Sequence, residues 1–141
     1  MTGIIDTSTE FGARAARRLQ DDLVVWMTTV NAKRAPVPSP VWFLSGDDDE
    51  VVVYSQLTQR IKNIASDPLV TLNFDGNGSG GDIVIFSGTA RIDDTLPSAD
   101  RNEAYVRKYG SQMGPLGFTP ESFGVAYEAG LRIKLTALRG H

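Results

Sequence analysis

Hydrophobic and β-branched positions fall into short runs along this chain, and most runs have the length of a strand. Residues 23–30 are rich in Val, Thr and Trp, and residues 131–138 alternate apolar with polar side chains. Further runs of this character cover residues 36–44, 51–55, 69–74 and 83–92. The pattern predicts six strands in hairpin-like succession, which favours an antiparallel barrel with helical excursions over a Rossmann sheet.

Helix signals occupy four of the intervening segments. Thr7-Ser8-Thr9-Glu10 has capping-box spacing and predicts a helix to about residue 19. Thr58 is placed to cap a second helix, which Asp67-Pro68 would end. A third helix is predicted from residue 97 to about Tyr109, ending at Gly110, and a short fourth one follows Thr119.

Two segments restrict the topology. The strand at residues 36–44 contains Pro38 and Pro40, which cannot donate ladder hydrogen bonds, so it must lie at an edge or be bulged. The glycine-rich residues 75–81 link two strands rather than a strand and a helix, which is typical of a hairpin loop and not of a dinucleotide fingerprint. Without repeats or a long linker, we expect residues 1–141 to form one domain.

Composition and charge exclude several function classes. The formal net charge of −3 argues against a nucleic-acid-binding surface, and no apolar run is long enough to cross a membrane. Residues 1–10 lack the basic and apolar regions of a signal peptide, so a cytoplasmic location is expected. The chain has no cysteine, and its one histidine is His141, so neither a metal site nor a Ser-His-Asp triad is expected. An enzyme of this composition would rely on an organic cofactor.

The candidate chemistry lies in residues 54–64, where a predicted strand meets a helix. Arg60, Lys62 and Asn63 fall near the helix N-terminus, a place that already attracts anions. Two cations there cost a few tenths to about 1 kcal/mol, which a bound phosphate would reverse. Alternatively, both cations are solvated or pair with the acidic residues 47–50, worth about 0–1 kcal/mol at a surface. We interpret the segment as a site for a phosphorylated ligand.

Aromatic residues permit two interpretations each. Trp42 could pack in a core or interface, or contact a ligand, because it lies between the prolines and Phe43. Tyr54 could donate a hydrogen bond to a ligand or pack in the barrel. Tyr105 and Tyr109 are four residues apart on a predicted helix, which favours a packed face.

Several stretches resemble the split β-barrel flavin- and deazaflavin-binding superfamily, which includes pyridoxamine 5′-phosphate oxidase and the F420-dependent reductases. They are residues 36–43, 53–55, 131–140, Arg60-Ile61-Lys62-Asn63-Ile64 with Asp67-Pro68, and Ser87-Gly88-Thr89-Ala90. The Arg-x-x-Asn-Ile element followed by Asp-Pro is the most specific part, and it is similar to the small actinobacterial F420-binding branch. Relatives often end in an aromatic residue where this chain has His141, so the resemblance assigns no stacking contact there.

The resemblance implies a homodimer with F420 in a groove between the subunits, and FMN is the alternative cofactor. Basic residues at the helix start would bind cofactor phosphate, which assigns that role to Arg60, Lys62 and Asn63, with Ser55 and Gln56 nearby. Ser87 and Gly88 would approach the same groove, unless they mark only a strand bend. The remaining implied cofactor-binding residues are Pro38, Ser39, Val41, Trp42, Tyr54 and Ile61.

The chemistry implied is hydride transfer from reduced deazaflavin to a small organic substrate, and no side chain is assigned as acid or base. Two rival hypotheses assume the same fold but no catalysed reaction. One is a non-catalytic protein that binds F420 or another phosphorylated molecule, and the other is a dimeric interaction module with an empty groove.

Overall fold

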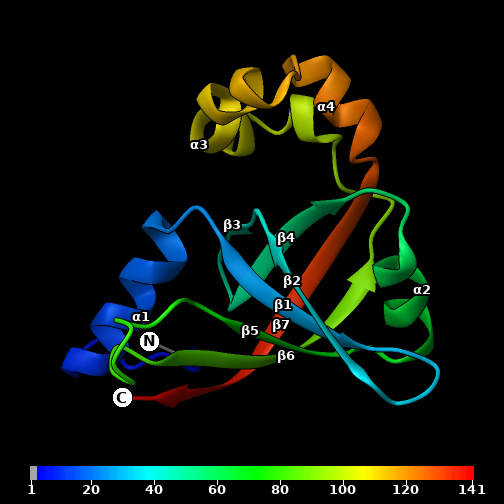
Figure 1. The fold of residues 1–141 in the computed structure, drawn as a ribbon. Coiled ribbons are helices and arrows are strands. Elements are labelled where there is room, and N and C mark those ends of the chain that lie inside the picture. Colours follow the sequence, from blue (N-terminus) through cyan, green and yellow to red (C-terminus); the bar gives the residue numbers. More distant parts are fainter. Residues whose placement is uncertain (1–2) are drawn as a thin grey trace.

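The computed structural model describes residues 3–141, and its main feature is a seven-stranded antiparallel sheet that curls into a split barrel (Figure 1). The strand order is β2-β1-β5-β6-β7-β4-β3. The strands are β1 (Val25–Val30), β2 (Pro36–Val41), β3 (Leu44–Ser45), β4 (Glu50–Ser55), β5 (Leu69–Asn73), β6 (Val84–Ile92) and β7 (Ala129–Gly140). The predicted fold class is confirmed, except that the sheet has seven strands and not six.

The seventh strand arises because the predicted strand at residues 36–44 is broken at Trp42 and Phe43. The Phe43 amide donates to the Tyr109 hydroxyl at 2.9 Å, and the Phe43 carbonyl accepts from Lys108 Nζ at 3.0 Å. Because helix side chains take both backbone groups of Phe43, this residue cannot join a ladder. The break carries the chain from β2 to β3, which lie at opposite edges of the sheet.

The predicted edge position of the proline-rich strand is confirmed. Among residues 3–141, strand β2 pairs with β1 alone, with Pro38 opposite Thr28 and Pro40 opposite Trp26. An edge strand needs hydrogen bonds on one side alone, so missing N–H groups are tolerated there.

Across the described residues, four α-helices and two 3-10 turns complete the fold. They are α1 (Glu10–Asp21), α2 (Gln59–Ser66), η1 (Ala99–Arg101), α3 (Glu103–Met113), η2 (Gly114–Leu116) and α4 (Pro120–Ala126). Thr9 rather than Thr7 caps α1, through a 2.9 Å hydrogen bond from the Gly12 amide. The predicted end of the third helix at Gly110 is wrong, because α3 continues to Met113, whose side chain is fully buried.

The apolar interior is divided into two clusters. The barrel cluster fills the sheet interior and includes Met27, Phe86 and Ile133, with Ala15 and Leu19 of α1 packed against it. The second, which we call the aromatic cluster, comprises Tyr54, Ala99, Tyr105, Tyr109, Met113 and Phe123, with Trp42, Leu44, Val52, Phe118 and Tyr127 packed against them. The segment from η1 to α4, here called the helical excursion, lies above the barrel and apart from α1 and α2 (Figure 1).

Candidate functional site

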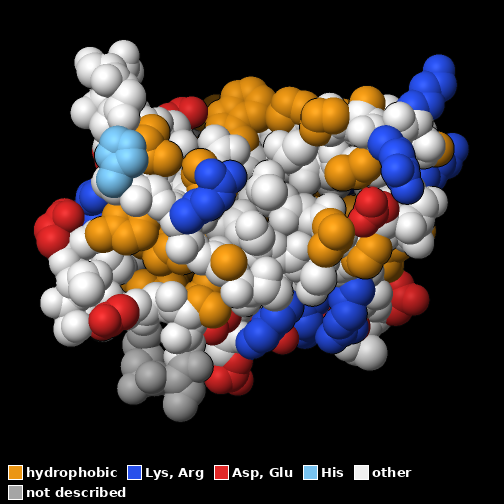
Figure 2. All heavy atoms as spheres, turned by 90° about the horizontal axis from the view of Figure 1, so that it is seen from below, with side chains coloured by type: hydrophobic (Ala, Val, Ile, Leu, Met, Phe, Trp, Pro, Cys, Tyr) orange, Lys and Arg blue, Asp and Glu red, His pale blue; other side chains and the backbone are white. Residues whose placement is uncertain are grey.

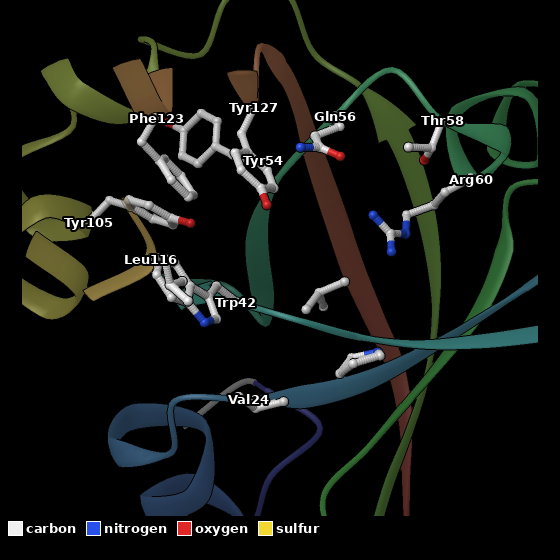
Figure 3. Close-up of a pocket in the computed structure, with 12 residues that line it drawn as sticks. Val24, Trp42, Tyr54, Gln56, Thr58, Arg60, Tyr105, Leu116, Phe123 and Tyr127 are labelled. Atoms are coloured by element: carbon white, nitrogen blue, oxygen red, sulfur yellow. The ribbon is translucent and has the colours of Figure 1, made fainter. Parts of the chain in front are cut away.

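A cavity of about 370 Å³ lies between the barrel and the helical excursion, and it is polar at one end and aromatic at the other (Figure 3). Its walls come from β2, the break after β2, the end of β4, the start of α2, and the excursion. The lining residues are Val24, Pro40, Val41, Trp42, Tyr54, Gln56, Thr58, Arg60, Tyr105, Leu116, Phe123 and Tyr127.

Arg60 forms the polar end of the cavity. Its guanidinium donates to the Ser55 hydroxyl at 2.9 Å and to the Ser39 hydroxyl at 2.7 Å, and these two contacts fix the plane of the group. Arg60 Nε is buried and finds no hydrogen-bond partner within residues 3–141. Burial lowers the pKa of Arg60, although an arginine stays protonated in any ordinary buffer. Arg60 is therefore a partly desolvated cation with donor capacity left over.

No acidic side chain among residues 3–141 forms a salt bridge with Arg60 or Lys62. The alternative in which these cations pair with the acidic turn at residues 47–50 is therefore wrong. Glu50 instead pairs with Arg132 at 2.8 Å, and Asp49 accepts from the Ile4 amide at 3.0 Å. The charge of Arg60 thus remains available to an anion in the cavity.

The N-terminus of α2 supplies further polar groups at this end. Thr58 occupies the N-cap position as predicted, but its side chain makes no capping hydrogen bond and lines the cavity instead. Gln56 is exposed and lines the cavity beside it. The first-turn amides of a helix favour negative charge, so these groups reinforce Arg60.

Lys62 and Asn63 do not converge on the cavity with Arg60. Positions 60 and 62 of a helix are about 200° apart around the axis, and Lys62 lies exposed. Asn63 is 2% exposed, and its amide donates to Thr29 Oγ1 and accepts from Gln59 Nε2, both at 3.1 Å. Both polar ends of Asn63 are therefore occupied inside the protein.

Stacked rings form the aromatic end. The Trp42 ring lies 4.5 Å from Tyr109 and 5.3 Å from Phe123, nearly parallel to both, and Phe123 stacks on Tyr127 at 4.2 Å. Trp42 packs in the aromatic cluster, as one interpretation held. It also lines the cavity, and its contact with a ligand stays a prediction. Figure 3 shows Trp42, Phe123 and Tyr127 on the side of the cavity opposite Arg60.

Hydroxyl groups in the aromatic cluster differ in their partners. Tyr54 donates to the Pro97 carbonyl at 2.7 Å and accepts from Asn102 Nδ2 at 3.1 Å. Tyr109 accepts from the Phe43 amide and lies 2.8 Å from the Leu23 carbonyl. Burial raises the pKa of both phenols, to about 12 for Tyr109, so both are neutral near pH 7. The predicted packed face of Tyr105 and Tyr109 is confirmed, since both are fully buried.

The structure thus brings together part of the predicted set. The residues that line the cavity are Val41, Trp42, Tyr54, Gln56 and Arg60, and Ser39 and Ser55 accept hydrogen bonds from Arg60. Besides Ser39 and Ser55, the predicted residues that do not line the cavity are Pro38, Ile61, Lys62, Asn63, Ser87 and Gly88.

Ser87 and Gly88 lie at a β-bulge, where the register of β6 against β7 shifts by one residue. A Cβ atom on Gly88 would lie 2.7 Å from the Lys134 carbonyl oxygen. Glycine at position 88 therefore permits a close approach of β6 to β7. This agrees with the alternative in which Ser87 and Gly88 mark only a strand bend.

Sequence reasoning did not place several lining residues in the site. Val24, Leu116, Phe123 and Tyr127 come from segments far from residue 60, and Tyr105 was assigned to packing alone. The one sequence signal for them is the unusual share of aromatic residues between positions 105 and 127.

His141 lies on the opposite side of the molecule. Its backbone pairs with Ile83 in both directions, at 2.9 and 3.0 Å, and its side chain is exposed. Figure 2 shows it on the face turned away from α3 and α4. In residues 3–141 no helix has the length and apolar character needed to cross a membrane, and no cluster of metal-ligating side chains occurs.

The chain matches the pyridoxamine 5′-phosphate oxidase family over residues 11–141 and therefore belongs to this family. No curated protein matches it. Among solved structures, an F420 reductase superimposes with a TM-score of 0.67 at 18% identity, covering 87% of this chain and 94% of the other.

Two further structures share the fold but differ in ligand. A FAD-binding protein from Mesorhizobium loti has a TM-score of 0.65 at 14% identity, covering 89% of this chain and 88% of its own. A heme storage protein from Vibrio cholerae has a TM-score of 0.54 at 14% identity, covering 93% and 89%. At identities this low, the structural similarity establishes the fold alone. The ligand must be inferred from the residues of the site.

Proposed function

We propose that the cavity binds the deazaflavin F420 and that the protein is an F420H2-dependent oxidoreductase acting on a small organic substrate. One observation supports this most: Arg60 is a partly buried cation without an acidic partner in residues 3–141, and its Nε proton is free. A phosphate oxygen in the cavity would satisfy that donor and compensate the charge.

The polar end is suited to a phosphate by its geometry. Ser39 and Ser55 hold the guanidinium in one orientation, so little side-chain entropy remains to be lost when an anion binds. The Thr58 hydroxyl and the first amides of α2 add neutral donors beside it.

The rest of the cavity is suited to a ring system. In this proposal the ring of the cofactor runs along Pro40, Val41 and Trp42, toward the aromatic end. F420H2 would supply a hydride when bound, and the protein would orient the reactants and exclude water. No residue is assigned as an acid or base.

The proposal includes a homodimer in a cytoplasmic setting, with the groove shared between subunits as the family resemblance implies. Sedimentation velocity at micromolar concentration tests the homodimer. We expect a species of twice the 15.3 kDa chain mass, and a persistent monomer would remove this part of the proposal.

FMN is the alternative cofactor, since its single phosphate suits the same polar end and a FAD-binding protein shares the fold. The absorption maximum of the bound chromophore distinguishes the two cofactors. The non-catalytic alternative would be favoured if bound F420H2 were never oxidised by any acceptor.

Titration of F420 against Arg60→Ala and Lys62→Ala tests the proposal. Removing a charge-assisted contact should weaken binding at least tenfold, or about 1.5–3 kcal/mol, in Arg60→Ala. Lys62→Ala is the matched control, because it removes a cation from the same helix that lies exposed outside the cavity. Its affinity should change by no more than about twofold.

Equal affinity in the wild type and in folded Arg60→Ala would refute the phosphate assignment. A larger loss in Lys62→Ala than in Arg60→Ala would place the phosphate outside this cavity. Circular dichroism and the melting temperature of each variant establish that it is folded.

A further inference from the structure

Tyr105 and Tyr109 lie four residues apart on α3 and are both 0% exposed, yet their hydroxyl groups differ completely. The Tyr109 hydroxyl accepts from the Phe43 amide and has two carbonyl oxygens within 2.9 Å. The Tyr105 hydroxyl has no partner anywhere in residues 3–141. The contrast is informative because the two tyrosines lie on the same helix and are equally buried.

A buried hydroxyl that lacks a hydrogen-bond partner destabilises the folded state. The packing of α3 requires only the ring, which lies 4.9 Å from both Tyr54 and Tyr109. Within residues 3–141, nothing therefore uses the oxygen atom of Tyr105.

The free hydroxyl is at the aromatic end of the cavity. Tyr105 lines the cavity, whereas Tyr109 does not, and Figure 3 shows the Tyr105 hydroxyl pointing between Tyr54 and Trp42. Of the other lining side chains, Val24, Leu116 and Phe123 offer a guest molecule apolar contact alone, whereas Tyr127 carries a further hydroxyl. The Tyr54 hydroxyl is already committed to Pro97 and Asn102.

The Tyr105 hydroxyl acts as a donor here rather than as an anion. Burial raises the pKa of Tyr105 far above its usual range, and the neighbouring Tyr109, Tyr54 and Tyr127 shift it in the same direction. The group therefore keeps its proton at any physiological pH, and that proton has no acceptor within the described residues.

We propose that Tyr105 is a specificity residue of an acceptor subsite, donating a hydrogen bond to the carbonyl oxygen of a flat, apolar molecule held at the aromatic end. The inference rests on the proposed function, which assigns the Arg60 end to the cofactor and leaves the aromatic end for the substrate. The substrate class is then an apolar ring compound with an exposed carbonyl group. A compound that lacks such an oxygen would leave the hydroxyl unpartnered and bind less well.

The test compares two probes of equal shape, 1-indanone and indane, by ligand-observed NMR with the full-length wild type and with Tyr105→Phe. The variant should bind 1-indanone about fivefold or more weakly and bind indane equally well or better, because it loses one donor and nothing else. Its melting temperature should equal or exceed that of the wild type.

Tyr109→Phe is the matched control. It removes a hydroxyl that the fold uses, so it should lower the melting temperature and leave the preference for 1-indanone over indane unchanged. An unchanged preference in Tyr105→Phe would overturn the inference. A fall in melting temperature as large as that of Tyr109→Phe would also overturn it, by showing that the Tyr105 hydroxyl is structural.

The two proposals fail in different ways. If wild type does not bind F420 but its preference for 1-indanone depends on Tyr105, the cofactor assignment is wrong and the acceptor subsite stands. If F420 binds through Arg60 and the probe preference is the same in Tyr105→Phe, only the acceptor subsite is wrong.

Discussion

Lys108 of α3 places its ammonium group 3.0 Å from the Phe43 carbonyl oxygen and 3.8 Å from the centroid of the Phe43 ring. Burial lowers the pKa of Lys108 to about 8, against a smaller opposing effect of Asp22 and Asp21. In the unfolded chain the same group titrates near its usual value of 10.5. Between these two pH values the unfolded state binds more protons, so the contribution of Lys108 to the unfolding free energy rises with pH.

We therefore expect the melting temperature of the wild type to increase relative to that of Lys108→Met between pH 7 and about pH 9.5. The methionine keeps a long apolar side chain but cannot titrate. The buried tyrosines also have raised pKa values, and their ionisation in the unfolded state lowers the unfolding free energy as the pH rises. This effect begins only near pH 10, outside the range of the experiment. If the melting temperatures of the two proteins changed with pH by the same amount across this range, Lys108 would titrate normally in the folded state.

At the residue scale, the sequence correctly placed Arg60 at the start of a helix, where it lines the cavity, but it grouped Arg60 with Lys62 and Asn63. Proximity along the chain does not say which side of a helix faces a cavity. The helical period contained part of that information, since positions 60 and 62 lie on opposite sides. The partners of Asn63 could not be predicted, because Thr29 meets it only after β1 and α2 have packed.

At the scale of elements, the bulge between β6 and β7 gives a stability prediction for Gly88. In Gly88→Ala the new methyl group would lie 2.7 Å from the Lys134 carbonyl oxygen, so one strand must shift. We expect a loss of about 1–3 kcal/mol in unfolding free energy, measured by urea denaturation.

Gly114→Ala is the control for that substitution. Gly114 has helical backbone angles, with φ −54° and ψ −52°, and an added Cβ would meet no atom within 4 Å. It should be neutral or stabilising by about 0.4–1 kcal/mol. If both alanine variants were equally stable, β6 and β7 would not be held as closely as the structure shows.

Most elements could be predicted because their signals are local. Alternation of apolar and polar residues identified the strands, and the prolines identified the edge strand. The break at Trp42 and Phe43 could not be predicted, since it depends on Tyr109, 66 residues away. The same holds for the end of α3, where burial of Met113 outweighs the helix-ending tendency of Gly110.

At the scale of the whole molecule, the cavity lies between the barrel cluster and the aromatic cluster, which differ in how much hydrogen-bonded structure surrounds them. The barrel cluster is enclosed by a continuous hydrogen-bonded sheet, whereas the aromatic cluster joins the excursion to the barrel through a few side chains such as Trp42, Leu44 and Tyr54. Elements with fewer non-local contacts open at lower free energy. A ligand in the cavity would contact both parts and so couple the excursion to the barrel.

Hydrogen exchange measures this coupling directly. Without ligand, amides of α3 and α4 should exchange faster than those of β5, β6 and β7, which open only with the whole sheet. Saturating F420, or FMN if that is the cofactor, should slow exchange in the excursion more than in the barrel, because the proposed cofactor ring would lie along Trp42, which stacks on Phe123 of α4. Arg60→Ala at the same ligand concentration should lose this added protection while its ligand-free pattern stays the same. Protection confined to α2 would instead show that the ligand occupies the polar end alone, without reaching Trp42.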